Sequence, residues 1–291
     1  MCQLRLKGGA NIKGFNCDYV EESLDLAAIA AEAGLEYTQI FSCSKIMAAM
    51  ANTLRLKNSS PGAFLPFSAT VEAEALGFAI TADAPPRRTV YPGNGLEALG
   101  KLHAIDFSQG QISSVLAACR LIKAQKLPVM LEMQGPLTIA AYGVDFGPFF
   151  SLWGRDAAID AFFNLAMAEL LKYAAKAKEA GVAILSYGDF LASLDILGPK
   201  YGQWFYQRFL KEFFNRLAVL AGDEFIVHLC PKTADFCLKI GVGGFKNYWP
   251  KGDSYLENCL SLRGKAGLVY GSCLKNATPF TKGAKIKELL L

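Results

Sequence analysis

Apolar residues recur along this chain with two periods, one typical of helices and one typical of strands. Helical spacing is found in five long stretches, at residues 18–34, 45–56, 109–125, 156–180 and 199–221. Short β-favouring runs alternate with them, at residues 36–41, 78–81, 127–133, 182–187, 224–229, 245–249 and 266–273. Strands that alternate with helices of this length predict an α/β fold with a parallel sheet.

About seven strands are compatible with either a closed (β/α)8 TIM barrel or an open doubly wound sheet. The hydrophobic fraction is 52% and the charged fraction 19%, and no Pro/Ser/Gly-rich or highly charged segment divides the chain. We therefore predict one α/β barrel domain over residues 36–291, preceded by an irregular segment and a helix over residues 1–35. Three prolines predict an irregular loop over residues 83–92, where Arg87 and Arg88 also lie.

Charge and cysteine content narrow the function classes. The net charge is +4 and the lysines are scattered among acidic residues, which argues against a nucleic-acid partner. The sequence has no apolar run of about 18 residues, so no membrane span is expected. Eight cysteines are too few for a disulfide scaffold in 291 residues. We therefore expect a soluble protein of the reducing cytoplasm.

A candidate metal site lies at the end of the run 224–229. His228 and Cys230 are two residues apart, and in a strand such residues share one face. Cys273 ends the later run 266–273, and it joins the pair if both strands end at one rim. Imidazole and thiolate ligands favour zinc, and three protein ligands leave the fourth position open for a substrate. The alternative interpretation is a buried histidine and a buried thiol that are merely neighbours.

Five sequence blocks carry a resemblance to a known family. They are LPFSATVEAEALG at residues 65–77, QGPLT at 134–138, GDFLAS at 188–193, HLC at 228–230, and Cys273 followed by Thr278-Pro279. In this order they resemble the uroporphyrinogen decarboxylase superfamily, and most closely its cobalamin-linked branch, the methylcobalamin:coenzyme M methyltransferases. The resemblance extends from about Glu36 to the C-terminus.

The resemblance implies a TIM barrel in which His228, Cys230 and Cys273 bind Zn2+. It also implies a zinc-dependent methyltransferase that moves a methyl group between methylcobalamin, carried by a separate corrinoid protein, and a small-molecule acceptor such as a thiol. Two alternatives remain open. One is a tetrapyrrole decarboxylase of the uroporphyrinogen type, although residues 1–34 have no arginine-rich motif like that of the decarboxylases. The other is a corrinoid-binding module of the same fold without catalytic turnover.

Further polar residues are candidates for the same site. Asp189 follows the run 182–187 and is either catalytic at the strand end or an N-cap of the turn that follows it. Glu74, with Glu72, is a candidate catalytic or histidine-orienting carboxylate, although helix capping is the expected role of at least one of them. Gln134 is a candidate substrate contact at a strand exit. His103 is expected to be structural.

Overall fold

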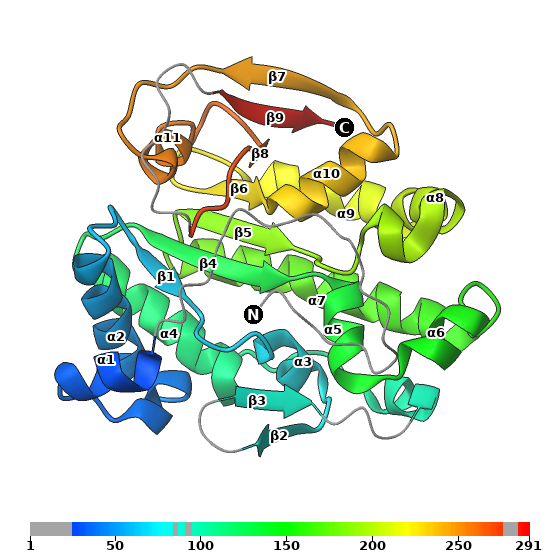
Figure 1. Cartoon of the computed structure of the whole chain (residues 1–291), viewed down its shortest axis with the longest axis horizontal. Coiled ribbons are helices and arrows are strands. Elements are labelled where there is room, and N and C mark those ends of the chain that lie inside the picture. The colour runs from blue at the N-terminus through cyan, green and yellow to red at the C-terminus, as the bar shows by residue number, and fades with distance from the viewer. Residues whose placement is uncertain (1–24, 84–86, 91–94, 276–284) are drawn as a thin grey trace.

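A seven-stranded sheet forms the centre of the molecule (Figure 1). The structure is a computed structural model that describes residues 25–83, 87–90, 95–275 and 285–291. Five strands pair in parallel, in the order β1 (Ala63–Leu65), β4 (Val129–Gln134), β5 (Ile184–Gly188), β6 (Ile226–Leu229) and β8 (Leu268–Tyr270). The sheet is extended by two antiparallel pairings, of β8 with β9 (Ile286–Leu290) and of β9 with β7 (Gly244–Tyr248).

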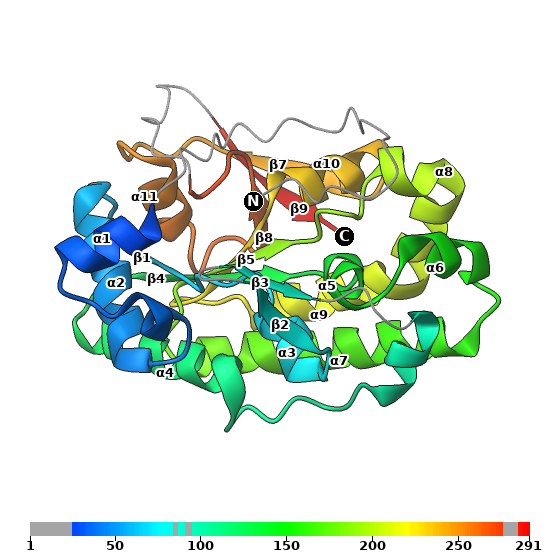
Figure 2. The ribbon, with the colours of Figure 1, turned by 60° about the horizontal axis from the view of Figure 1, so that its bottom comes forward.

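Helices cover one face of this sheet, as Figure 2 shows. They are α4 (Gly110–Ala124), α7 (Ala157–Glu179) and α9 (Lys211–Leu220). The larger apolar core lies between these helices and strand residues such as Leu131, Leu185 and Val227. The opposite face carries a smaller core, in which Met130 and Ile184 pack with side chains of α11 (Tyr255–Leu260). Two cores exist because successive strand residues point to opposite faces.

Shorter helices follow the ends of the parallel strands. After β4 come α5 (Pro136–Gly143) and α6 (Phe146–Leu152), and after β6 comes α10 (Pro231–Lys239). After β5 the chain forms α8 (Leu194–Phe205), a π-helical turn (Tyr206–Leu210) and then α9. The N-terminal part contributes α1 (Leu26–Glu32), a 3-10 helix (Tyr37–Phe41), α2 (Ser44–Lys57) and α3 (Val71–Leu76). A 3-10 helix (Gly95–Lys101) precedes α4.

The α/β class with a mainly parallel sheet is confirmed, and most predicted helices are found within a few residues of their expected bounds. Within the described ranges the strands form an open sheet whose edges are β1 and β7. The strand predicted over residues 266–273 is shorter, because only Leu268–Tyr270 pairs with its neighbours. Neither β1 nor β9 was predicted.

Two local predictions are wrong. Residues 36–41 form a 3-10 helix in place of a strand, because Ile40 packs into a small core with α1 and α2. Residues 83–92 are not wholly irregular, because β2 (Ile80–Asp83) and β3 (Arg87–Val90) pair as an antiparallel hairpin. The prolines at 85, 86 and 92, on which that prediction rested, lie outside the described residues.

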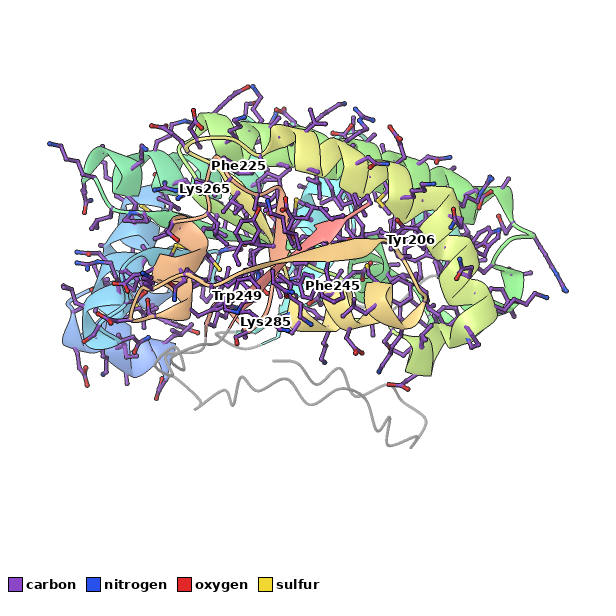
Figure 3. The ribbon with its side chains drawn as sticks, turned by 90° about the horizontal axis from the view of Figure 1, so that it is seen from above. Tyr206, Phe225, Phe245, Trp249, Lys265 and Lys285 are labelled. Carbon is purple, nitrogen blue, oxygen red and sulfur yellow. The ribbon has the colours of Figure 1, made fainter. Side chains whose placement is uncertain are left out.

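The edge strand β7 exposes large apolar side chains. Phe245 is 51% exposed and Trp249, just after the strand, is 65% exposed. Figure 3 shows both residues along β7 on the side opposite the long helices. Among the described helices, none has both the length and the apolar run that a membrane span requires.

Candidate active site

Strand register places three polar side chains next to one another on the sheet face that packs against α11. Glu132 on β4 is paired with Ser186 on β5, and Ser186 is paired with His228 on β6. Residues paired in this way point to the same face of a sheet, so the three side chains form a line across three adjacent strands. We call Glu132, Ser186 and His228 the polar row. The predicted site residue His228 therefore lies at one end of this row.

His228 is buried, and both of its ring nitrogens have hydrogen-bond partners. Nε2 lies 3.1 Å from the carbonyl oxygen of Ser272, and Nδ1 lies 3.2 Å from the hydroxyl oxygen of Ser186. A carbonyl only accepts, so Nε2 carries the proton and donates it, while Nδ1 accepts from Ser186. Burial lowers the pKa of His228 to about 4, against the opposing effect of the Ser272 hydrogen bond. The imidazole is therefore neutral at pH 7, which is the form that binds metals.

Cys230 and Cys273 follow two different strands near His228. Cys230 comes directly after β6, and Cys273 comes after β8. Cys230 is the N-cap residue of α10, and its backbone N–H donates to the carbonyl of Tyr187 at 2.8 Å. Its Cβ is 3.3 Å from the place where a side chain on Gly188 would begin, so it lies beside the end of β5. Cys273 is half-buried and directly follows Ser272, whose carbonyl accepts from His228. The three predicted ligands thus come from neighbouring parts of the sheet.

The chemistry of these residues fits zinc, although they are not gathered around a single point. In the part of the chain that the structure describes, no three or more His, Cys, Asp or Glu side chains are grouped so that they could hold one metal ion. One imidazole and two thiols are a donor set that zinc uses. Because both nitrogens of His228 are hydrogen-bonded, one of these bonds must be exchanged before the ring binds a metal. The ligand set therefore stays a prediction.

Gln134 lies at the end of β4, two residues beyond Glu132. Its backbone N–H donates to the carboxylate of Glu72 at 3.1 Å, and its side-chain nitrogen is 3.4 Å from Glu132. Its side-chain oxygen Oε1 is buried and has no hydrogen-bond partner among the described residues. A buried acceptor without a partner is costly unless a ligand or water satisfies it. This orphaned acceptor supports the prediction that Gln134 contacts a substrate.

Glu72 is a buried carboxyl group on α3 that faces the sheet. Burial, with a smaller contribution from the nearby Glu132, raises its pKa to about 8 against two backbone hydrogen bonds that lower it. Glu72 therefore keeps its proton at neutral pH. Its hydrogen bond goes to the backbone of Gln134 on β4, while the ring of His228 bonds to Ser186 and Ser272. An orienting role of Glu72 on that ring therefore gains no support.

Asp189 is fully buried and caps a helix. Its carboxylate accepts from the backbone N–H groups of Leu137 and Thr138, at 3.1 and 2.8 Å, and from the Thr138 hydroxyl at 2.8 Å. These groups belong to the first turn of α5, whose N–H groups have no partner within the helix. Burial raises the pKa of Asp189 to about 6, although these hydrogen bonds oppose the shift. The sequence predicted a cap on the turn that follows Asp189, whereas most of these hydrogen bonds go to α5 and one further backbone hydrogen bond comes from Leu191 in that turn.

Glu74 points to a different part of the molecule. Its carboxylate accepts from the backbone N–H of Gln111 at 3.3 Å and from the side-chain amide of the same residue. Gln111 lies in the first turn of α4, where a negative charge is favourable. Of the two glutamates on α3, Glu74 thus has the capping role, and its catalytic role stays an untested prediction. His103 was expected to be structural, and its ring nitrogen Nδ1 lies at hydrogen-bonding distance from the carbonyl oxygen of the next residue, Ala104.

Four residues next to the site were not identified from the sequence. Ser186 and Glu132 are polar residues that interrupt the apolar pattern of their strands, and this interruption could have identified them from the sequence. Tyr255 packs edge-on against His228, with ring centres 5.8 Å apart. Lys275 pairs with Glu132. Nothing in the local sequence of Tyr255 or Lys275 indicates these long-range contacts.

Comparison with known proteins adds a family assignment. Two curated relatives are named methylcobamide:CoM methyltransferase MtaA. The one from Methanosarcina barkeri (strain Fusaro / DSM 804) is 25% identical over 180 residues, which is 58% of this chain and 51% of the relative. The other, from Methanosarcina barkeri, is 24% identical over 179 residues with the same coverage. The chain therefore spans about half the length of the curated relatives it matches.

A solved structure also shares this fold. It is described as a methyltransferase from Methanosarcina mazei, with a TM-score of 0.57 and 20% identity over 77% of this chain and 65% of that one. In addition, the profile of the family described as uroporphyrinogen decarboxylase (URO-D) matches residues 32–246, a range that contains His228 and Cys230 but ends before Cys273. Because this match covers well over half of the sequence, the chain belongs to the uroporphyrinogen decarboxylase (URO-D) family.

Proposed function

We propose that this protein is a zinc-dependent, corrinoid-linked methyltransferase that moves a methyl group between methylcobalamin on a corrinoid protein and a small thiol. The observation that carries the proposal is the surroundings of His228. A neutral, buried imidazole lies on β6 two residues before Cys230, and its Nε2 contacts the carbonyl of the residue that precedes Cys273. The two relatives named as methylcobamide:CoM methyltransferases support the same reaction class.

In this proposal His228, Cys230 and Cys273 hold the zinc ion. Zinc, when bound, supplies a Lewis acid that keeps an acceptor thiol in its thiolate form. In the transfer to the thiol, the cobalt–carbon bond breaks and its electron pair stays on the corrinoid. A carbon–sulfur bond forms from the electron pair of the thiolate, and the thiol proton leaves to solvent when the acceptor binds.

The other residues of the site bind and orient. With zinc on Nε2 in place of the Ser272 carbonyl, Nδ1 of His228 would carry the proton and donate it to the Ser186 hydroxyl, which would hold the ring orientation. Asp189 holds the first turn of α5 against the end of β5, which sets the path of the chain just after Gln134. The acceptor Oε1 of Gln134, which has no partner among the described residues, offers a hydrogen-bond acceptor to a bound substrate. The protonated carboxyl of Glu72 holds the backbone of Gln134 in place.

Metal content and methyl transfer test the proposal together. The protein is purified without added metal, its zinc is measured, and transfer from free methylcobalamin to a thiol is followed by the absorbance of the corrinoid. We expect about one zinc per chain, and we expect His228→Ala, Cys230→Ala and Cys273→Ala each to lower both zinc content and transfer.

Cys43→Ala is the matched control, because Cys43 is also half-buried but precedes α2, far from these strands in sequence. The Cys43→Ala variant should keep its zinc content and its methyl-transfer activity. Full zinc and full transfer in Cys273→Ala would show that the ligand assignment is wrong. Decarboxylation of a tetrapyrrole by a zinc-free preparation would replace the proposal with the decarboxylase alternative, and corrinoid binding without turnover would replace it with the binding-module alternative.

A further inference from the structure

Residues 271–275, which we call the strap, run back across the sheet after β8. The carbonyl of Ser272 accepts from His228 on β6, and the side chain of Lys275 pairs with Glu132 on β4. The strands lie in the order β4, β5, β6, β8, so the strap passes over two strands to reach the third.

The length of the strap agrees with this path. Three strand spacings of about 4.8 Å amount to about 14 Å. The strap is made of bends and turns, so its backbone and the long Lys275 side chain cover this distance together. The ion pair thereby ties the end of the strap to β4.

The strap is also packed against the sheet beneath it. Leu274 is buried in the smaller core with Tyr255 and Ile226. Gly271 lies so close to Tyr255 that a Cβ at this position would be 3.0 Å from the Tyr255 hydroxyl oxygen. Tyr255 in turn packs against the His228 ring. The strap thus rests on the same side chains that surround the candidate active site.

Cys273 lies between two polar anchors of the strap. On one side, Ser272 is hydrogen-bonded to His228, and on the other side Lys275 is paired with Glu132. The Glu132 side chain is only 19% exposed, and its second oxygen is near the side-chain nitrogen of Gln134. Glu132 thus connects the strap to the predicted substrate contact as well as to the polar row.

We propose that Glu132 and Lys275 are positioning residues, whose ion pair holds the strap and thereby sets the place of Cys273 beside His228. The role of Cys273 as a ligand rests on the proposed function, but the anchoring of the strap does not.

The test measures backbone hydrogen exchange of the strap by mass spectrometry in the full chain. Lys275→Met and Glu132→Gln each remove the ion pair while keeping side chains of similar size. We expect each to raise the exchange rate of residues 271–275 by about five-fold or more, which corresponds to about 1 kcal/mol. The double charge reversal Glu132→Lys with Lys275→Glu should restore the rate to within about two-fold.

Lys176→Met is the matched control, because it removes a comparable ion pair with Glu179 on α7. It should leave strap exchange unchanged. A second readout is the rate at which zinc is lost to a chelator, which should rise in both single variants and recover in the charge reversal and in Lys275→Arg. An ion pair that only stabilises the strap would change strap exchange but leave the rate of zinc loss unchanged.

Unchanged strap exchange in both single variants, or no recovery in the charge reversal, would overturn the proposal. The two proposals fail separately. If wild-type protein has no zinc and transfers no methyl group, but strap exchange follows the ion pair, then the anchoring stands and the proposed function is wrong.

Discussion

Ser186 on β5 and His228 on β6 occupy paired register positions, and the Ser186 hydroxyl oxygen lies 3.2 Å from Nδ1 of the His228 ring. The hydroxyl donates to Nδ1 because Nε2 donates to the Ser272 carbonyl. The Ser272 carbonyl, which only accepts, therefore sets the tautomer of His228, the one buried histidine of the described chain, and the Ser186 hydroxyl takes the donor role.

Ser186→Ala should weaken both folding and the candidate metal site. The variant leaves a buried imidazole nitrogen without a donor, which costs about 1–3 kcal/mol of unfolding free energy. Loss of a residue that orients a metal-binding histidine lowers metal affinity by about 10–100-fold in other proteins. Urea unfolding and zinc competition measure the two effects. Ser151→Ala, which removes an exposed hydroxyl on α6, is the control. It should change neither the stability nor the zinc affinity.

His228 should stay neutral far below the usual range for histidine. Burial lowers its pKa to about 4, whereas the unfolded value is about 6.5. A lowered folded pKa stabilises the protein fully above about pH 6.5, and this contribution is lost as pH falls through about 4. The chain has two histidines, so an NMR titration of the ring protons gives two curves, which His228→Gln assigns. A His228 midpoint near 6.5 in the folded protein would show that the ring is solvated.

Glu72 should give the stability of the protein a pH dependence of the opposite sign. Its folded pKa of about 8 lies above the unfolded value of about 4.3, so the folded state binds the proton more tightly. The resulting stabilisation is present below about pH 4 and is lost as pH rises towards 8, by roughly 5 kcal/mol for a shift of this size.

Glu72→Gln replaces the protonated acid with a neutral amide and should remove this part of the pH dependence. Urea unfolding of both proteins at pH 5, 7 and 8.5 isolates the contribution, because the other titrating groups are shared. We expect the variant to gain stability relative to wild type as pH rises. A difference in unfolding free energy between the variant and wild type that stays constant across this pH range would mean that Glu72 is already ionised in the folded state. Glu179→Gln, on the exposed end of α7, is the control.

Asp189→Asn and Glu74→Gln should separate capping from catalysis. The Asp189→Asn change presents an amide to groups of α5 that donate to both carboxylate oxygens, so we expect a loss of about 2–4 kcal/mol of stability. Glu74→Gln weakens the contact with the first turn of α4, at about 1 kcal/mol. The unfolding free energies of the two variants, compared with wild type, give both losses. If Glu74→Gln loses methyl transfer while its zinc content and folding are unchanged, this result would support the catalytic role predicted for Glu74.

Much of the local structure was predictable because backbone geometry imposes its own period. The spacing of Ile112, Val115 and Cys119 identified α4, and these residues do face the core. The same reasoning placed His228 and Cys230 on one strand face. The reasoning from periodicity gave the wrong element for residues 36–41. A short apolar run is compatible with a strand or with a helical turn until its packing partners are known.

The candidate site depended on contacts between residues far apart in the chain. Sequence pattern alone determined the α/β class and the strand that carries His228. Only the tertiary structure decided that Asp189 caps α5, that Glu74 caps α4 and that Lys275 reaches Glu132. The physical reason is that a period of two or 3.6 residues follows from bonds within one segment. Pairings across the sheet depend instead on strand order and register, and several arrangements of these satisfy the same apolar pattern.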